Sequence, residues 1–272
     1  MRKLIIIFSA LTLAAAAYAQ ELTIIHFNDT HSHIDPIRSG KNTGLGGVVE
    51  QALYIDSVRQ AEGKNNVLLL HAGDFSQGTS YFTELHGNIE IDVLNACKYD
   101  ATCLGNHEFD NGIAELTRRL SNLKVPVVCA NYDFSGTTLD KYVQPYVVVK
   151  KAGLKIGIIG LLTDVTAVVD CEIAAVLKYQ NPVEVTNKYA AYLKDVKKCD
   201  LVICLTHLGY DEEPYTDQML APKTRNVDII VGGHSHTNLK EADRVQNLDG
   251  KDVIIVQDWK WGLKAGNLKV KF

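Results

Sequence analysis

The feature that most constrains the fold of this chain is a pairing that recurs along it: a short apolar run ends in a cluster of His, Asp or Asn. The apolar runs occupy residues 21–27, 66–70, 101–104, 200–205 and 226–231. Runs of this length are typical of buried strands. The intervening segments 48–59, 89–98 and 181–198 have helical patterns, so the sequence predicts an α/β protein. Ligands of α/β sheets bind beyond the carboxyl ends of the strands, where these clusters would lie.

Two of the clusters contain ligand-type residues spaced two apart. Asp29 and His31 follow the first run, and His234 and His236 follow the last of the five. On extended backbone, residues two apart project to the same side. We therefore expect each pair to form half of a metal site, with a polar turn after a strand as the alternative.

The cluster at 105–110, Gly-Asn-His-Glu-Phe-Asp, has catalytic features. Asn106 offers a neutral oxygen ligand and His107 an imidazole, with the carboxylate of Asp110 three residues later. A carboxylate that holds a histidine fixes its tautomer and raises its basicity. The alternative is a simple helix start, in which Asn106 is the N-cap of a helix from about residue 113.

Two further runs end in Asp74 and in His207. Together, the strand ends present two carboxylates, one amide and four imidazoles: Asp29, His31, Asp74, Asn106, His207, His234 and His236. This set is too large for one tetrahedral ion, and it suits two ions that share the two oxygens of Asp74. Mixed N/O ligands favour Zn, Mn, Fe or Co. The sequence contains no C-x-x-C, so a thiolate zinc site has no support.

The motifs at 28–31, 73–74, 105–110, 206–209 and 233–236 resemble those of calcineurin-like metallophosphoesterases, and more closely the catalytic domain of the 5′-nucleotidase family. The resemblance implies a four-layer α/β/β/α sandwich with two mixed central sheets. It implies one metal on Asp29, His31, Asp74 and His236. It implies a second metal on Asp74, Asn106, His207 and His234. It also implies a catalytic dyad of His107 and Asp110.

The implied activity is hydrolysis of nucleoside monophosphates. Two metal ions would activate a water for in-line attack on phosphorus, and His107 would stabilise the charge on the phosphoryl oxygens. His236 departs from close 5′-nucleotidases, which often have an amide residue there. A histidine is common in the wider group, which includes 2′,3′-cyclic nucleotide phosphodiesterases. Cyclic diesterase, UDP-sugar hydrolase and broad phosphatase activities therefore remain alternatives.

The first 19 residues have the form of a secretory signal peptide. Arg2 and Lys3 precede an apolar core and an Ala17-Tyr18-Ala19 cleavage site. The core is too short to span a bilayer comfortably, so we expect a periplasmic or secreted protein without a membrane span after cleavage. The formal charge is −4, and −6 once Arg2 and Lys3 are removed, which argues against a polyanion such as nucleic acid as partner.

We expect a single catalytic domain over residues 20–272, without the C-terminal nucleotide-recognition domain usual in this family. We expect a small phosphoester, a nucleotide, as the substrate. A separate polypeptide would then supply the pocket that binds its nucleoside. Six cysteines and predicted export permit disulfides, but Cys103, Cys129 and Cys204 lie in apolar runs. Buried free thiols are therefore favoured over three bridges.

Two other classes of function compete with a phosphoesterase. A metal-dependent amidohydrolase or peptidase also uses His/Asp pairs, but the chain has no H-E-x-x-H and such an enzyme gives the 105–108 element no role. A non-enzymatic metal- or nucleotide-binding protein would have an inactive site, whereas here no expected ligand is missing.

Overall fold

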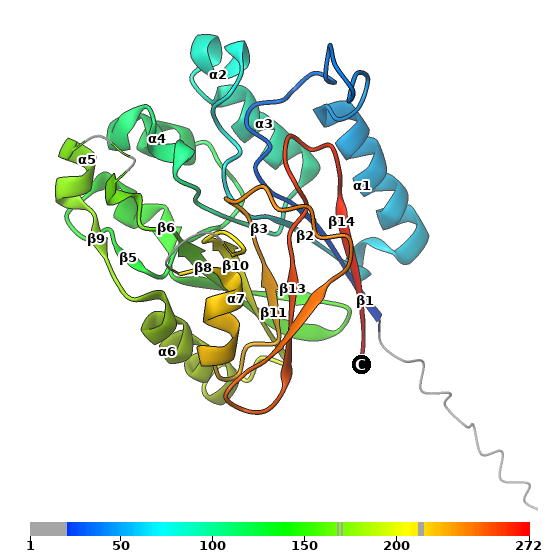
Figure 1. Ribbon diagram of the computed structural model, residues 1–272, viewed down its shortest axis with the longest axis vertical. Coiled ribbons are helices and arrows are strands. Elements are labelled where there is room, and N and C mark those ends of the chain that lie inside the picture. Colours follow the sequence, from blue (N-terminus) through cyan, green and yellow to red (C-terminus); the bar gives the residue numbers. More distant parts are fainter. Residues whose placement is uncertain (1–20, 168, 170, 212–214) are drawn as a thin grey trace, which may run out of the picture.

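The computed structural model describes residues 21–167, 169, 171–211 and 215–272 (Figure 1). The predicted signal peptide at 1–19 lies outside these residues. Two six-stranded sheets form the centre of the molecule. The first has the order β14 (Gly266–Lys271), β1 (Glu21–Phe27), β2 (Val67–His71), β3 (Ala101–Cys103), β4 (Val127–Val128) and β6 (Val143–Gln144). The second has the order β12 (Asp243–Gln246), β13 (Asp252–Val256), β11 (Ile229–Val231), β10 (Leu201–His207), β8 (Leu154–Leu162) and β7 (Tyr146–Lys151).

Both sheets are mixed. In the first sheet β1, β2, β3, β4 and β6 run parallel, and only β14 is antiparallel to its neighbour β1. In the second sheet β8, β10, β11 and β13 run parallel, with antiparallel strands β7 and β12 at the edges. Parallel strands end at the same edge of a sheet, so the loops that follow β1, β2, β3, β10 and β11 are neighbours.

The two sheets pack face to face, and each has helices on its other face. Leu22 and Ile24 of β1 lie in the core between the sheets, together with Ile203 of β10. The alternate residues Ile25 and Phe27 pack toward α1 (Val48–Glu62) and α3 (Asn88–Cys97). Because both faces are covered, β1 is buried at every position from Leu22 to Phe27 rather than alternating between buried and exposed.

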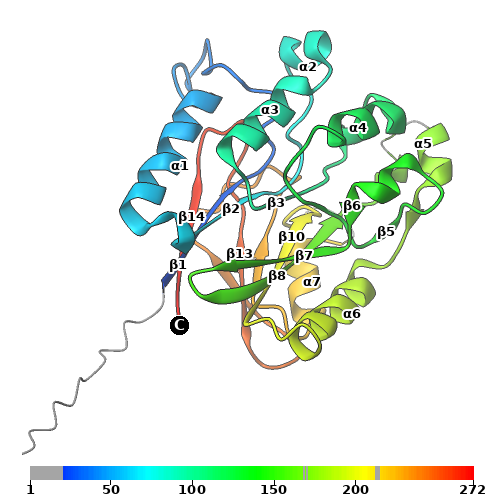
Figure 2. The same ribbon diagram turned by 180° about the vertical axis from the view of Figure 1, so that it is seen from behind.

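The outer face of the second sheet packs against α6 (Pro182–Asp195) and α7 (Asp217–Leu220). The side chain of Asn181 caps α6 by accepting from the backbone N–H of Val183, and Pro182 occupies the first turn. Leu193 of α6 packs directly on Gly157 of β8. In Figure 1 and from behind in Figure 2, α1 and α6 lie on opposite sides of the paired sheets. The predicted four-layer α/β/β/α sandwich is confirmed.

The remaining elements lie around this core. They are α2 (Ser80–Leu85), α4 (Gly112–Leu120), α5 (Cys171–Val176) and the two-stranded sheet β5 (Tyr132–Asp133) with β9 (Lys178–Tyr179). The apolar run at 125–130 gives only the two-residue strand β4. A one-turn 3-10 helix, His107–Phe109, precedes α4. All six cysteines are free thiols, and Cys103, Cys129 and Cys204 are buried as predicted. In the described part of the chain, no helix is long and apolar enough to cross a membrane.

Candidate metal centre

The loops at the carboxyl ends of five strands bring the predicted ligands together. Within each of three groups of side chains, the ligand atoms lie within 4.8 Å of one another. The groups are Asp29 with His31 and His236, His31 with Asp74 and His107, and Asp74 with His207 and His234. Residues more than 200 positions apart in the sequence therefore meet at the carboxyl ends of strands from both sheets.

The first group is built from the loops after β1 and β11. The Nε2 atom of His236 lies 3.0 Å from Nε2 of His31 and 3.3 Å from Oδ1 of Asp29. His31 Nε2 is also 3.7 Å from the same Asp29 oxygen. Two imidazole nitrogens and a carboxylate oxygen thus converge, and these are ligand atoms that Zn and similar divalent ions accept.

Asp74, which follows β2, lies between the first group and the third. Its Oδ2 atom is 3.0 Å from Nε2 of His207 and 3.8 Å from Nε2 of His31. His207 is fully buried at the end of β10. One carboxylate is therefore within reach of imidazoles from both groups, which is the arrangement expected of a ligand shared by two ions.

Two of the buried atoms at this place that lack an aligned hydrogen-bond partner are good metal ligands. The Nδ1 atom of His207 donates to the carbonyl of Ala72 at 2.7 Å, so Nε2 is the ring nitrogen that faces Asp74 and that would bind a cation once its proton is displaced. That Nε2 and the side-chain oxygen Oδ1 of Asn106 are both buried without an aligned partner. Asn106 also makes no helix-capping hydrogen bond, contrary to the N-cap alternative. A polar atom is costly to bury unpaired, and a bound cation would satisfy both atoms.

The backbone around the centre is strained. Five of the predicted ligands have φ between 47° and 79°, in the left-handed region that non-glycine residues rarely adopt: Asp29, His31, Asp74, His234 and His236. Their spacing of two therefore does not reflect extended backbone, and that part of the prediction is wrong. The side chains still converge, because each loop turns sharply at the end of its strand. Strain of this kind clusters at functional sites.

Glycines let the loops approach one another closely. A Cβ atom on Gly105 would lie 2.1 Å from Oδ1 of Asp74, and one on Gly233 would lie 2.5 Å from the carbonyl oxygen of Ala72. Such distances exclude any side chain at these positions. The Gly residues of the 105–110 and 233–236 motifs are thus required for close packing of the ligand loops.

The electrostatics of the centre follow from burial and from the two carboxylates. Burial lowers the pKa of His234 to about 4 and also lowers the pKa of His31. For His207, burial lowers the pKa, but the neighbouring Asp74 outweighs this effect and raises it to about 10. Neutral imidazole is the form that binds a metal, so a cation must displace the proton of His207.

His107 and Asp110 form the predicted pair. The distance from His107 Nδ1 to Asp110 Oδ2 is 2.9 Å, and about one third of each side chain is exposed. The hydrogen bond that His107 donates to Asp110 raises the pKa of His107 above its ordinary value. Because Asp110 occupies Nδ1, Nε2 is the ring nitrogen left to meet a substrate.

Glu108 has a role that the sequence did not reveal. Its fully buried carboxylate accepts from the backbone N–H groups of Gly105 at 2.6 Å, Asp74 at 2.9 Å and Ser76 at 3.1 Å. Burial raises the pKa of this carboxyl to about 7. Glu108 thereby ties the loop after β2 to the loop after β3. The only sequence signal was its place within the 105–110 motif.

A second unpredicted feature is the loop 258–263, which precedes β14. The side chain of Asn28 donates to the carbonyl of Trp259 at 2.6 Å, and the backbone N–H of Trp261 donates to the carbonyl of Asp29 at 2.7 Å. These bonds hold Lys260 beside the centre, with its Nζ 3.2 Å from Nδ1 of His236. A lysine in a loop has no pattern by which sequence reasoning could find it.

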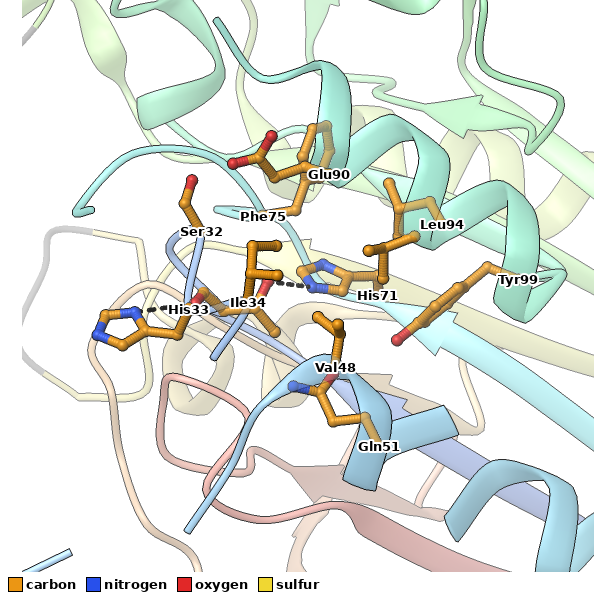
Figure 3. A pocket seen from close by; sticks show the side chains of 12 residues that line it. Ser32, His33, Ile34, Val48, Gln51, His71, Phe75, Glu90, Leu94 and Tyr99 are labelled. Carbon is orange, nitrogen blue, oxygen red and sulfur yellow. Dashed lines mark hydrogen bonds between the residues drawn. The ribbon is translucent and has the colours of Figure 1, made fainter. Parts of the chain in front are cut away.

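A cavity lined by polar and apolar side chains lies behind the loop that contains Asp29 and His31 (Figure 3). His71 lies at its centre and bonds through Nε2 to Oγ1 of Thr30 at 3.1 Å. Glu90, Ser32 and Gln51 also line it, and each has a buried polar atom without a partner. Burial raises the pKa of Glu90 and lowers that of His71 to about 3. The residues that line this cavity pack behind the loop that contains Asp29 and His31. The cavity itself lies outside the cluster of predicted ligands.

The chain is similar to known phosphoesterases over nearly all of its length. The family model described as calcineurin-like phosphoesterase matches residues 22–238. The snake venom 5′-nucleotidase of Crotalus adamanteus is 35% identical over 97% of this chain and 47% of its own length. The 5′-nucleotidase of Homo sapiens is 33% identical over 94% of this chain and 47% of its own length. The chain thus spans about half the length of the curated relatives it matches.

Solved structures agree with the sequence relatives. The 5′-nucleotidase precursor from Thermus thermophilus superposes with a TM-score of 0.84 at 37% identity, over 93% of this chain and 51% of that one. The NAD nucleotidase of Haemophilus influenzae gives a TM-score of 0.83 at 30% identity, over 94% and 54%. With its two-sheet sandwich, its converging His and Asp side chains and these relatives, the chain belongs to the calcineurin-like phosphoesterase family of metal-dependent phosphoester hydrolases.

Proposed function

We propose that this protein is a dinuclear-metal phosphomonoesterase of the 5′-nucleotidase type, which hydrolyses nucleoside monophosphates. The observation that supports this most directly is the position of Asp74, whose Oδ2 is within 3.8 Å of both His31 and His207. The curated relatives at 33–35% identity, named 5′-nucleotidases, support the substrate class.

The proposed ligand sets follow the two groups. One ion is assigned to the side chains of Asp29, His31, Asp74 and His236. The other is assigned to the side chains of Asp74, Asn106, His207 and His234. When bound, such ions supply Lewis-acid polarisation of the phosphoryl group and lower the pKa of a water. The mixture of N and O ligands suits Zn, Mn, Fe or Co.

The proposed role of His107 is to donate a proton or hydrogen bond from Nε2 to the phosphoryl or leaving oxygen. Asp110 favours the protonated ring and fixes its orientation through Nδ1. The backbone N–H of His107 donates to Oδ1 of Asp74 at 3.0 Å, which places the ring next to the shared ligand. A positioned acid of this kind contributes roughly 10²–10⁴-fold to rate.

A substrate panel tests the proposed activity. The mature chain is loaded with Mn²⁺ or Zn²⁺ and assayed with 5′-AMP, 3′-AMP, 2′,3′-cyclic AMP, a UDP-sugar and p-nitrophenyl phosphate. We expect monoester turnover that chelation abolishes and metal restores, with Asp74→Asn as a control for contaminating phosphatase. Preference for the cyclic diester would instead support the second candidate, which the histidine at position 236 favours. Absence of turnover with bound metal would support a non-enzymatic binding protein.

We further propose export after cleavage before Gln20. The charge and apolar pattern of residues 1–19 support export. N-terminal sequencing of protein from the periplasm or medium tests it, and an intact Met1 on cell-associated protein would contradict it.

A further inference from the structure

Lys260 is a half-buried lysine without an anionic partner at the edge of the candidate metal centre. Its Nζ lies 3.2 Å from Nδ1 of His236 and 4.6 Å from the ring centre of Trp261. Among residues 21–167, 169, 171–211 and 215–272, no carboxylate lies within ion-pair distance of its ammonium. A cation that is partly removed from water gains most from a negatively charged partner.

The loop that holds Lys260 is fixed on both sides of that residue. The N–H of Trp259 donates to the carbonyl of Thr237 at 3.0 Å, and the N–H of Trp261 donates to the carbonyl of Asp29 at 2.7 Å. Both tryptophans have left-handed backbone, with φ of 59° and 61°. The ring of Trp261 also stacks on His33 at 4.5 Å. Strained backbone persists where surrounding contacts determine it, so Lys260 is held at the centre rather than drifting there.

The contact between Lys260 and His236 is incompatible with metal binding through Nε2 of His236. An ammonium only donates, so Nδ1 accepts from it and the neutral ring has its proton on Nε2. Nε2 points at Asp29 Oδ1, 3.3 Å away, among the other predicted ligand atoms. If Nε2 gives its lone pair to a cation, the ring proton must lie on Nδ1. The Nδ1–H group of His236 and the ammonium of Lys260 are then two donors that face each other. Lys260 would need another acceptor.

We propose that the ammonium of Lys260 binds the phosphate group of the substrate, and that it leaves His236 when the centre is loaded. This inference rests on the proposed function. A phosphomonoester dianion at the centre offers the negative charge that Lys260 lacks, within the reach of a four-carbon side chain. The selectivity that follows is for dianionic monoesters over monoanionic diesters, because a lysine acts on phosphate as a point charge.

Calorimetry with inorganic phosphate tests the contact without turnover. Metal-loaded wild type, Lys260→Met and Lys260→Arg are titrated with phosphate, with Lys264→Met as the matched control. Lys264 lies in the same region and bonds to Asn238 at 2.6 Å, away from the predicted ligands. We expect Lys260→Met to weaken phosphate binding roughly 5- to 20-fold, Lys260→Arg to keep part of it, and Lys264→Met to bind as wild type.

Kinetics and ¹⁵N NMR of histidine give two further readouts. Lys260→Met should raise KM for p-nitrophenyl phosphate with little change in kcat, since the contact exists before and during reaction, and should affect bis(p-nitrophenyl) phosphate less. In the metal-free protein, Lys260→Met should shift the Nδ1 resonance of His236. Addition of Zn²⁺ to wild type should move the ring proton of His236 from Nε2 to Nδ1.

The outcomes separate the two proposals. If wild type is active and Lys260→Met has the same phosphate affinity and the same KM as wild type, the role of Lys260 is overturned. The proposed function then remains intact. A metal-loaded wild type that neither binds phosphate nor hydrolyses any phosphoester would overturn the proposed function, and this inference with it. An equal loss in Lys264→Met would also overturn the inference, because the effect would then be one of general surface charge.

Discussion

Asp74 accepts a hydrogen bond from the backbone N–H of His107 through Oδ1, at 3.0 Å, while its Oδ2 lies 3.0 Å from Nε2 of His207. One carboxylate thus touches the loop of the proposed catalytic histidine and a proposed metal ligand. The backbone of His107 is therefore held next to the proposed metal centre.

Replacement of Asp74 by Asn should remove metal from the protein. The change leaves the hydrogen bond to His107 in place but removes the negative charge near both groups of ligands. We expect the metal content, measured by mass spectrometry after dialysis, to fall from about two ions per chain to one or none. Asp195→Asn, an exposed residue on α6, should keep the wild-type content. Retention of two ions by Asp74→Asn would contradict its bridging role.

Replacement of His107 by Ala should lower kcat for a phosphomonoester roughly 10²–10⁴-fold, with metal content unchanged. Asp110→Asn tests the orientation separately. Asp110 raises the pKa of His107, so the protonated ring persists to higher pH in wild type. Activity that needs this proton is lost as pH rises through that pKa. The alkaline limb of the kcat profile should therefore move to lower pH in Asp110→Asn, and an unmoved limb would contradict the pairing.

Replacement of Gly105 by Ala should disrupt the ligand loops. The new Cβ would lie 2.1 Å from Oδ1 of Asp74, so the loops after β2 and β3 must separate. We expect a loss of roughly 2–4 kcal/mol in the free energy of unfolding, together with loss of metal. Gly250→Ala is the matched control. It introduces strain at φ 70° but meets no atom within 4 Å, so it should cost about 1 kcal/mol and keep the metal.

Asp217 should make stability depend on pH. It is fully buried, accepts from Oγ1 of Thr206 at 2.7 Å, and burial raises its pKa from 3.8 to about 7. Between these values the unfolded chain loses a proton that the folded chain keeps, so this group lowers stability as pH rises from about 4 to about 7. In Asp217→Asn that loss should disappear. Urea unfolding of the metal-free protein at pH 5 and pH 8 measures it.

At pH 8 the Asp217→Asn variant should be more stable relative to wild type than at pH 5, by an amount on the order of a few kcal/mol. Asp195→Asn serves here as the exposed control, with the same change of charge and little change in solvation on folding. Equal pH dependence in wild type and Asp217→Asn would show that the buried carboxyl is ionised or solvated in the folded protein.

The sequence alone predicted the buried strands and the polar side chains that their ends bring together. That these side chains bind metal stays a prediction. Strand β1 has the predicted bounds 21–27, and β10 begins within one residue of its prediction. The physical reason is local: a strand buried on both faces must be apolar throughout, and polar residues directly after it stand at the edge of its sheet.

The tertiary structure decided how those ends are held and what surrounds them. The left-handed backbone at Asp29 and His236, the three N–H groups bound by Glu108, and Lys260 next to His236 all depend on contacts between loops far apart in the chain. No periodic pattern encodes such contacts, because each loop conformation is imposed by its neighbours rather than by its own residues. The residue types of the candidate site can therefore be predicted from the sequence. Their geometry is determined only by the tertiary structure.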